Sequence, residues 1–540
     1  MSRIQRPELV SSGDGTNVYR ADVLVLGGGP AGTWAAVSAA RQGASVILAD
    51  KGFCGTSGAT APSGTGVWYV EPDPAKREAA MASREAMGGY LQDRKWMSRV
   101  LDRTYDSVHQ LAEWGYPFPV DDEGRPRRNS LQGPEYMRLM RKRVKQAGAK
   151  ILDHSPALEL LVDGDGAVVG AMGLHRQSGD RWTVHAGAVV IATGGCAFLS
   201  GALGCNVLTG DGYLMAAEAG AELSGMEFSN AYAMSAEYGS VTKTLFYNWA
   251  TFTHEDGRPV EGAKSKGGRS IIAKALDKGR VFPQLDKADA QTQSAMRLAQ
   301  PNFFLPLDRA GIDPFSQRFP ITLRLEGTVR GTGGLRIVDD TCATTVPGLY
   351  AAGDAATREL ICGAFTGGGS HNCAWAMSSG TWAGTAAGAF AKGKGQVRRG
   401  AERRGDVGLR ERGGHRIDAA SLTRAVQAEV TPYERNYFRD ADRLSDSLLR
   451  LDALWTSAAG ADAADRSGIV KTREAAAMLA TARWMYRSAL ARRESRGMAR
   501  RLDHPYQDDS QRRSIHAGGL REVWTRPGPV LSRPVAEAAE

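Results

Sequence analysis

Residues 22–32 read DVLVLGGGPAG, an apolar run followed at once by a cluster of glycines. The apolar run is typical of a short buried strand, and a helical pattern follows over residues 31–42. A second strand is predicted over residues 45–49, and it ends at Asp50. Strand, helix and strand in this order form a βαβ unit, so the sequence predicts a doubly wound α/β fold.

The glycines of this stretch have the spacing G-x-G-x-x-G, which is typical of a dinucleotide-binding turn. Gly27 permits the tight turn out of the strand, and Gly29 leaves room for a pyrophosphate to approach the backbone. Gly32 lets the helix pack closely on the sheet, while the helix presents its N-terminal N–H groups to the phosphates. Asp50 lies 23 residues after Gly27, where a carboxylate can accept hydrogen bonds from the adenosine ribose.

Two later stretches repeat the pattern of a strand that ends in glycine. Residues 189–195 read VVIATGG, and residues 347–356 read PGLYAAGDAA. Asp354 in the latter stretch can accept hydrogen bonds from the ribityl hydroxyls of a flavin. This stretch begins about 320 residues after Gly27. Because an extended FAD needs a second anchor for its flavin half, the separation favours FAD over NAD as the cofactor.

The charge of the chain is unevenly spread. The 540 residues carry a formal net charge of +9, and much of the excess lies in residues 398–416 and 492–513. A basic run is most often a solvated face, and steering of an anionic substrate or an acidic partner is the alternative. Aromatic residues do not interleave with these runs, so we expect no nucleic-acid partner.

The six cysteines form no C-x-x-C pair, so we expect no metal or iron–sulfur site within the chain. Low cysteine use favours a reducing compartment. The N-terminal residues lack the apolar core of a signal peptide, and no run of 18 apolar residues occurs. We therefore expect a cytoplasmic protein without a membrane span, and homo-oligomer formation stays open.

Composition changes along the chain indicate its domain organisation. Residues near 230–325 hold many aromatic residues and scattered prolines with little βαβ rhythm, which indicates an inserted domain. The expected units are the first part of the FAD-binding domain (1–230), the inserted domain (231–325), the second part of the FAD-binding domain (326–395), a basic linker (396–417), a helical domain (418–500) and a tail of loops and turns (501–540).

In these motifs the chain resembles the fumarate reductase and succinate dehydrogenase flavoprotein family, which includes L-aspartate oxidase and the adenylylsulfate reductase α subunit. The resemblance covers nearly the whole chain. It implies an α/β fold: a Rossmann-like FAD-binding domain, an inserted α+β capping domain and a C-terminal helical domain. Four further stretches carry it: 57–64 (SGATAPSG), 331–335 (GTGGL), 362–371 (CGAFTGGGSH) and 494–505 (ESRGMARRLDHP).

The chain departs from this family in the substrate pocket. The dicarboxylate enzymes have a histidine just before the glycine loop, and here Val329 or Arg330 stands at that place. Their histidine and arginine of the later segment are replaced here by Cys362 and Thr366. These losses remove charge-assisted hydrogen bonds to a carboxylate. We therefore expect a larger, less acidic substrate than succinate, fumarate or aspartate.

The resemblance also implies roles for individual residues. Arg269 begins a stretch that resembles the family's R-D-V-V, whose arginine donates a proton or clamps the substrate; a surface arginine in a basic loop is the alternative. Ser370 is expected to cap a helix that begins near His371 and points at the flavin N1–C2=O edge. The family's covalent flavin histidine aligns with Gly58, and residues 50–66 hold no histidine. FAD is therefore expected to bind non-covalently.

The candidate site residues fall into three groups. The catalytic candidates are Arg269, His371 and Cys362. The candidate substrate contacts are Tyr232, Tyr238, Tyr247 and His254, and Trp68 and Tyr69 are candidate walls of the flavin pocket. The expected FAD-binding residues are Gly27, Gly29, Pro30, Ala31, Gly32, Asp50, Lys51, Ser57, Gly58, Ala192, Thr193, Gly194, Asp211, Gly353, Asp354, Ser370 and His371.

The sequence favours an FAD-dependent dehydrogenase or reductase, in which a hydride passes between flavin N5 and a small organic substrate bound beneath the capping domain. One alternative is a flavoprotein subunit that passes electrons to a separate iron–sulfur or other electron-transfer protein. A second is an oxidase that uses O₂. A third, of another class, is a flavin-binding sensor or scaffold without turnover.

Overall fold

The main sheet of the computed structural model is mixed, with a parallel middle and an antiparallel flank. It runs in the order β17-β7-β8-β9-β2-β3-β6, with β1 added to β2 and β16 to β9. The structure describes residues 5–13, 15–121, 123–265, 268–366, 368–394, 401–409, 416–463 and 468–531. The strands are β1 (Glu8–Gly13), β2 (Thr16–Leu26), β3 (Val46–Ala49), β6 (Lys150–Leu152), β7 (Ala157–Val162), β8 (Val168–Leu174), β9 (Arg181–Ile191), β16 (Leu349–Ala351) and β17 (Glu402–Arg403).

The register of the parallel strands brings the three glycine motifs together. Leu26 at the end of β2 lies opposite Ala49 of β3 and Ile191 of β9. Ala351 at the end of β16 also lies opposite Ile191. Because parallel strands end at the same edge of a sheet, the loops that follow these strands share one edge, where ligands of such folds bind.

Two helices pack on this sheet and on each other without intervening side chains. Helix α1 (Pro30–Arg41) follows the first glycine motif, and α11 (Gly368–Lys394) follows the last. A Cβ at Gly380 would lie 2.3 Å from the Ala31 carbonyl oxygen, and one at Gly384 would lie 2.2 Å from that of Ala35. The glycines therefore allow the two backbones to approach closely, which fixes the start of α11 next to the phosphate-binding turn.

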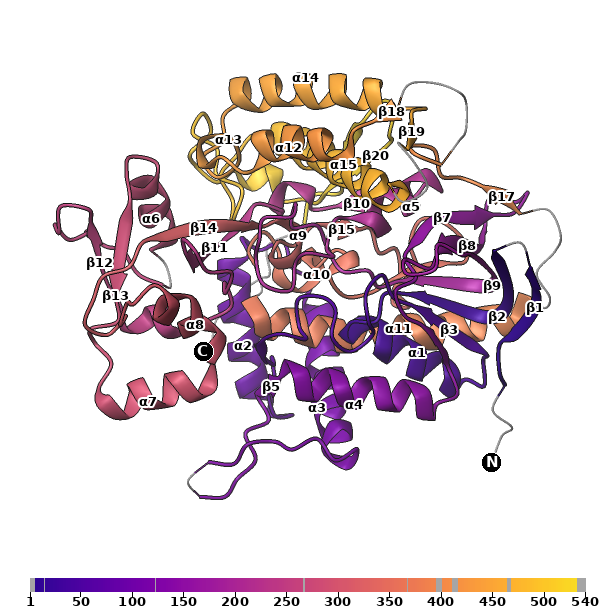
Figure 1. Cartoon of the computed structure of the whole chain (residues 1–540), viewed down its shortest axis with the longest axis horizontal. Helices are drawn as coiled ribbons and strands as arrows, with labels where there is room; N and C mark the ends of the chain where they lie inside the picture. Colours follow the sequence, from indigo (N-terminus) through magenta and orange to yellow (C-terminus); the bar gives the residue numbers. More distant parts are fainter. Residues whose placement is uncertain are drawn as a thin grey trace, which may run out of the picture.

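Helices and short strands outside the main sheet complete the FAD-binding domain (Figure 1). They cover the sheet and supply the loops above its ligand-binding edge. These elements are β4 (Gly64–Gly66), α2 (Pro74–Met87), α3 (Arg94–Glu113), β5 (Ser130–Gln132), α4 (Gly133–Gln146), α5 (Asp211–Glu218), β10 (Leu223–Ser224), η1 (Met226–Phe228), α9 (Gly327–Arg330), β15 (Gly334–Leu335), η3 (Gly353–Ala355) and α10 (Glu359–Cys362).

The inserted segment forms a separate α+β unit beside the FAD-binding domain, at the left of Figure 1. Its antiparallel sheet has the order β11-β14-β13-β12, and an aromatic cluster that includes Tyr247 and Phe303 fills its core. Its elements are β11 (Ala231–Ala236), η2 (Phe246–Trp249), β12 (Thr251–His254), α6 (Arg269–Leu276), β13 (Val281–Gln284), α7 (Ala290–Ala299), α8 (Pro301–Arg309) and β14 (Ile321–Glu326).

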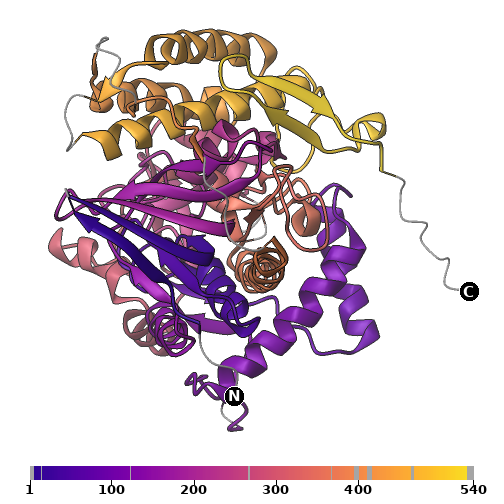
Figure 2. The same cartoon turned by 90° about the vertical axis from the view of Figure 1, so that its right-hand side faces the viewer.

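The C-terminal part forms a helical layer on one side of the sheet domain, as both whole-chain views show (Figures 1 and 2). The tail after it differs from the expected loops and turns, because β20 pairs with β10 and with β21. β20 thereby hydrogen-bonds to β10, a short strand that lies much earlier in the sequence. The elements are α12 (Ala419–Val430), α13 (Tyr433–Asn436), α14 (Ala441–Ala458), α15 (Ile469–Ala491), η4 (Asp509–Gln511), β20 (Ile515–Gly518) and β21 (Trp524–Pro527).

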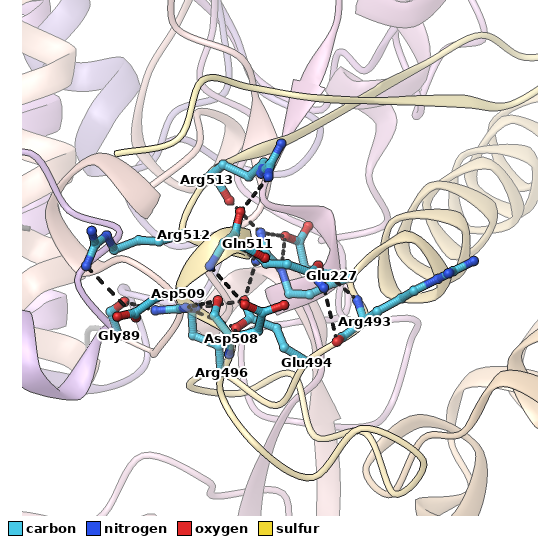
Figure 3. A network of polar contacts seen from close by, with 12 residues as sticks. Gly89, Glu227, Arg493, Glu494, Arg496, Asp508, Asp509, Gln511, Arg512 and Arg513 are labelled. Atoms are coloured by element: carbon cyan, nitrogen blue, oxygen red, sulfur yellow. Dashed lines mark hydrogen bonds and ion pairs between the residues drawn. The ribbon is translucent and has the colours of Figure 1, made fainter. Parts of the chain in front are cut away.

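The basic run at residues 492–513 is not the solvated face that its composition favours. Arg492 is fully buried and pairs at 2.7 Å with both Glu227 and Glu494. Arg496, also buried, pairs with Glu494 and donates to the Gly89 carbonyl oxygen (Figure 3). The expectation of solvation was wrong here because Glu227, from a distant segment, and Glu494, within the run, neutralise these guanidinium groups inside the protein.

The structure describes only part of the region that the sequence predicts to be a basic linker. Residues 396–400 and 410–415 of the expected basic linker lie outside the described residues. The described part of that region contains β17 and β18 (Arg416–Ile417), the latter paired with β19 (Asp462–Ala463). Within the described ranges, no helix is long and apolar enough to cross a membrane, and no cluster of three metal-ligating side chains occurs.

Candidate FAD and substrate site

One cavity of about 1380 Å³ opens at the ligand-binding edge of the main sheet. Its lining combines the three glycine motifs, the loop at residues 57–66 and the start of α11 with residues of the inserted domain and with Gly497, Met498 and Arg500. Single-ligand pockets usually measure about 300–1000 Å³. The cavity therefore has room for a dinucleotide and a second molecule.

The glycines of the first motif have the geometry that a phosphate-binding turn needs. Gly27 has φ +108°, and a Cβ there would lie 2.2 Å from the Ala192 carbonyl oxygen. A Cβ at Gly32 would lie 1.8 Å from the Gly27 carbonyl oxygen, so this glycine serves close packing and does not line the cavity. Gly29 faces open space, with no described atom within 4 Å of its Cβ position. A phosphate group can therefore approach the backbone at Gly29.

The Asp50 carboxylate accepts hydrogen bonds that hold the turn of the first glycine motif in place. One carboxylate oxygen accepts a hydrogen bond from the Gly28 N–H at 2.5 Å. The other accepts from the Gly52 N–H and the Ser57 hydroxyl, both at 2.7 Å. Asp50 is buried and lines the cavity, and each of its oxygens has lone-pair capacity left for a ribose hydroxyl.

Lys51 and Asp211 line the cavity but neutralise each other. The Lys51 ammonium lies 2.7 Å from Asp211 and 2.7 Å from Glu474 of α15, and it donates to the Thr209 hydroxyl. Burial lowers the pKa of Lys51, but the two carboxylates outweigh burial and raise it above its ordinary value. This pairing joins the helical domain to the rim of the FAD site.

Asp354 is held by an arginine that also fixes a neighbouring loop. Burial raises the pKa of Asp354, and the ion pair with Arg358 opposes the rise. Arg358 is fully buried and also donates to the carbonyl oxygens of Thr328, at 3.0 Å, and of Gly331. Arg358 thereby links residues 328–331 to the stretch that contains Asp354.

The start of α11 differs from the expected cap. The helix already includes Gly368, so Ser370 lies in its first turn and not at its cap position. The Ser370 hydroxyl lies 3.2 Å from His371 Nδ1, and the Trp68 ring supports the His371 ring at a centroid distance of 4.4 Å. Ser370 and His371 line the cavity, whereas Trp68 lies behind His371 and outside the lining.

Four polar atoms of lining residues are buried without a hydrogen-bond partner in the described structure. They are the Thr193 hydroxyl, the Oδ1 atoms of Asn230 and Asn372, and the Nε atom of Arg84. Buried polar groups in proteins are almost always hydrogen-bonded. Their position in the cavity therefore fits a bound molecule that offers both donors and acceptors, as FAD does.

The inserted-domain side of the cavity carries an excess of positive charge. Arg269 lines the cavity, and burial, followed by the nearby Arg330, lowers the pKa of Arg269 to about 10. Arg330 and Lys243 share one buried carboxylate, Glu326, each at 3.4 Å. Arg500, which follows α15, lies over the Tyr437 ring. These four cations, with one paired carboxylate between them, make this end of the cavity suited to an anion.

The remaining candidate residues differ in whether they line the cavity. Tyr232 lines the cavity, whereas Tyr247 packs in the aromatic core of the inserted domain, and Tyr238 and His254 lie outside the lining, as does Tyr69. Cys362 is fully buried and outside the lining, so we correct its assignment and give it no chemical role. Cys362 is the last residue of α10, and its side chain packs in the main hydrophobic core. Every expected FAD-binding residue except Gly32 lines the cavity.

Sequence reasoning missed several residues of the lining: Arg84, Lys243, Asn372, Tyr437, Met498 and Arg500. Arg330 alone had a sequence signal, because it directly precedes the glycine loop. Met498 and Arg500 lie in the quoted stretch 494–505, which gave no indication that it lines the cavity, and the others come from segments without a recognisable motif. Their role could be found only once the fold had brought them to one cavity.

Two family models match the chain at its opposite ends. The model described as an FAD-binding domain matches residues 22–234. The model described as the C-terminal region of fumarate reductase flavoproteins matches residues 422–518. The first range contains the turn at Gly27–Gly32, and the second contains the helical layer and the ESRG stretch.

Characterised relatives agree with these matches. A fumarate reductase flavoprotein subunit from Mycobacterium tuberculosis is 26% identical over 90% of this chain and 93% of its own length. An L-aspartate oxidase from Streptomyces coelicolor is 28% identical, over 62% of this chain and 63%, just under two thirds, of its own length.

Solved structures share the fold along the whole chain. A chain of Escherichia coli quinol fumarate reductase has a TM-score of 0.81 at 20% identity and covers 96% of this chain and 98% of its own. Adenylylsulfate reductase from Archaeoglobus fulgidus has a TM-score of 0.74 at 18% identity, over 98% and 99%. The two family models and the full-length relative show that the chain is similar to fumarate reductase flavoproteins and that it is an FAD-dependent oxidoreductase.

Proposed function

We propose that the protein transfers a hydride between FAD and a small organic anion, which binds between the glycine motifs and the inserted domain. The observation that carries this proposal is that one cavity is lined both by the dinucleotide motif and by the cations Arg269, Arg330 and Arg500. FAD, when bound, supplies a hydride acceptor or donor at its N5 atom. The protein must hold the substrate, exclude water and handle the accompanying proton.

Arg269 is the residue that we assign to the proton. Its guanidinium donates weakly to the Tyr232 carbonyl oxygen at 3.5 Å, so most of its donors remain available to a substrate. Its pKa of about 10 lies below that of an ordinary arginine, because burial, and then Arg330, disfavours its charged form. A group with a lowered pKa gives up its proton more readily to a carbon or oxygen of the substrate.

The charge of the cavity refines the expected substrate class. The residues lost at positions 362 and 366 argued for a less acidic substrate than a dicarboxylate. The cations from other segments offset that loss, so we propose an organic anion. Succinate and fumarate stay disfavoured in this proposal, because the family's ligands for them are absent and the cavity is large.

The test is a substrate screen with the flavin as reporter. Organic anions and their neutral amides are added anaerobically, and bleaching of the flavin absorbance identifies a substrate. Arg269→Gln should then lower kcat by about 10²–10⁴-fold, the range for a lost acid or base, with FAD content unchanged. Arg280→Gln removes an exposed ion pair with Glu237 in the same domain and should act as wild type. Unchanged turnover in Arg269→Gln would remove Arg269 from the chemistry.

The name of one relative supports a second candidate. The Mycobacterium tuberculosis relative is a subunit, so we also consider that this chain passes electrons to a separate electron-transfer protein. Copurification of a coloured partner, together with slow reoxidation of the isolated reduced protein by O₂, supports this candidate. Fast reoxidation by O₂ supports an oxidase. A bound flavin that no donor reduces supports the scaffold alternative.

A further inference from the structure

We propose that Arg84 of α2 is a substrate-binding residue that contacts an anionic group of the substrate. The inference rests on the proposed function and names a side chain in the cavity that no sequence motif indicates. Arg84 lines the cavity although it belongs to a helix that otherwise packs against α3. Its side chain adds a charge from α2 to a pocket whose other cations, Lys243, Arg269, Arg330 and Arg500, come from other segments.

Arg84 is buried without a neutralising partner. The residue is 3% exposed, and among the described residues no carboxylate lies within ion-pair distance of it. The adjacent Glu85 cannot serve, because it pairs with Arg94 at 2.6 Å. A buried charge without a counter-ion is costly. A bound anion would supply the counter-charge that the protein itself does not.

Backbone carbonyls hold the guanidinium in place but leave part of it free. The Nη2 atom donates to the carbonyl oxygens of Thr366 at 2.8 Å and Cys362 at 3.4 Å, and also to that of Phe365. The Nε atom is buried and has no partner in the described structure. Carbonyls orient a guanidinium without cancelling its charge. The group is therefore fixed in position and still able to attract an anion.

Hydrogen bonds hold the segments around Arg84 in place, and these segments contribute to the cavity lining. The Thr366 N–H donates to the sulfur of Met498, which also lines the cavity. The end of α2 is held from two sides, because the Gly88 carbonyl accepts from the Ala364 N–H at 2.8 Å and the Gly89 carbonyl accepts from Arg496 (Figure 3). Because these contacts hold the guanidinium in position before the substrate arrives, the entropic cost of binding is lower.

The test compares carboxylates with their neutral amides. Acetate, malonate and benzoate, and the corresponding amides, are titrated into the FAD-loaded protein, and the flavin difference spectrum gives each Kd. We expect at least one carboxylate to bind wild type more tightly than its amide. Arg84→Gln should weaken that carboxylate about tenfold or more, as expected for a lost charge-assisted hydrogen bond, and leave the amide unchanged. Arg77→Gln is the matched control, because Arg77 lies on the same helix and pairs with Asp102.

The outcomes separate this inference from the proposed function. A wild-type protein that binds no carboxylate better than its amide contradicts the anionic substrate itself. A carboxylate preference that survives unchanged in Arg84→Gln overturns the role of Arg84 alone. If Arg84→Gln does not fold, Arg84→Lys keeps the charge with one nitrogen. This variant should retain the preference for the carboxylate while binding it more weakly, and affinities equal to those of wild type would also overturn the inference.

Discussion

Replacing Glu494 with glutamine tests the buried arginine network most directly. Its carboxylate accepts from Arg492 and Arg496 at 2.7 Å and from the Asp508 N–H at 2.8 Å, and it is fully buried (Figure 3). The amide cannot neutralise the two guanidinium groups. Removing one partner of a buried pair costs about 3–5 kcal/mol, so local opening of residues 492–513 should become roughly 140- to 3700-fold more frequent.

Hydrogen exchange of residues 492–513 measures this opening. The Ser495 N–H, bonded to the Tyr506 carbonyl at 3.0 Å, is a suitable reporter, because it exchanges only when the segment opens. Glu78→Gln is the control, since Glu78 pairs with Arg94 at the surface, where an ion pair contributes about 0–1 kcal/mol. Exchange in Glu494→Gln within threefold of wild type would refute the view that charge pairing holds the tail.

Two further variants test the FAD site and its surroundings. Asp50→Ala should weaken FAD retention without changing the fold, because it removes the acceptor of the Gly28 and Gly52 N–H groups as well as a ribose ligand; a full complement of FAD at equal affinity would contradict this placement. Burial, and then Glu227, raises the pKa of Glu359 to about 7 from an ordinary 4.5, so the folded state binds the proton more tightly and wild type should lose stability as pH rises from about 4.5 to 7. In Glu359→Gln the melting temperature should therefore fall less than that of wild type between pH 5 and 8, and parallel profiles would show that Glu359 does not titrate there.

The FAD end of the cavity could be predicted from the sequence because its requirements are local. A strand, a tight turn and a helix need glycines at fixed spacing, as at Gly27, Gly29 and Gly32. The parallel register then places the ends of β2, β3, β9 and β16 at one edge without further information. The helix start at Gly368 was displaced from the expected position, because glycine carries no capping side chain by which to recognise it.

The substrate end could not be predicted because its residues come together only through tertiary packing. Arg84 lies on α2, in no motif, and Arg500 lies in the stretch 494–505, whose pattern does not indicate that it reaches the cavity. The basic run at 492–513 was misjudged for the same reason. The carboxylate that neutralises Arg492 is Glu227, which is 265 residues away in the sequence. The amino-acid composition shows how many charged residues a segment contains, but not which residues neutralise them.

The absorption spectrum of the purified protein, before and after acid precipitation, tests the central claim most directly. The account predicts flavin bands near roughly 375 and 450 nm that move to the supernatant, because FAD binds at the glycine motifs and residues 50–66 offer no histidine for a covalent link. Colour that stays in the pellet would contradict the non-covalent site. A protein that shows no flavin, even after FAD is added, would contradict the account as a whole.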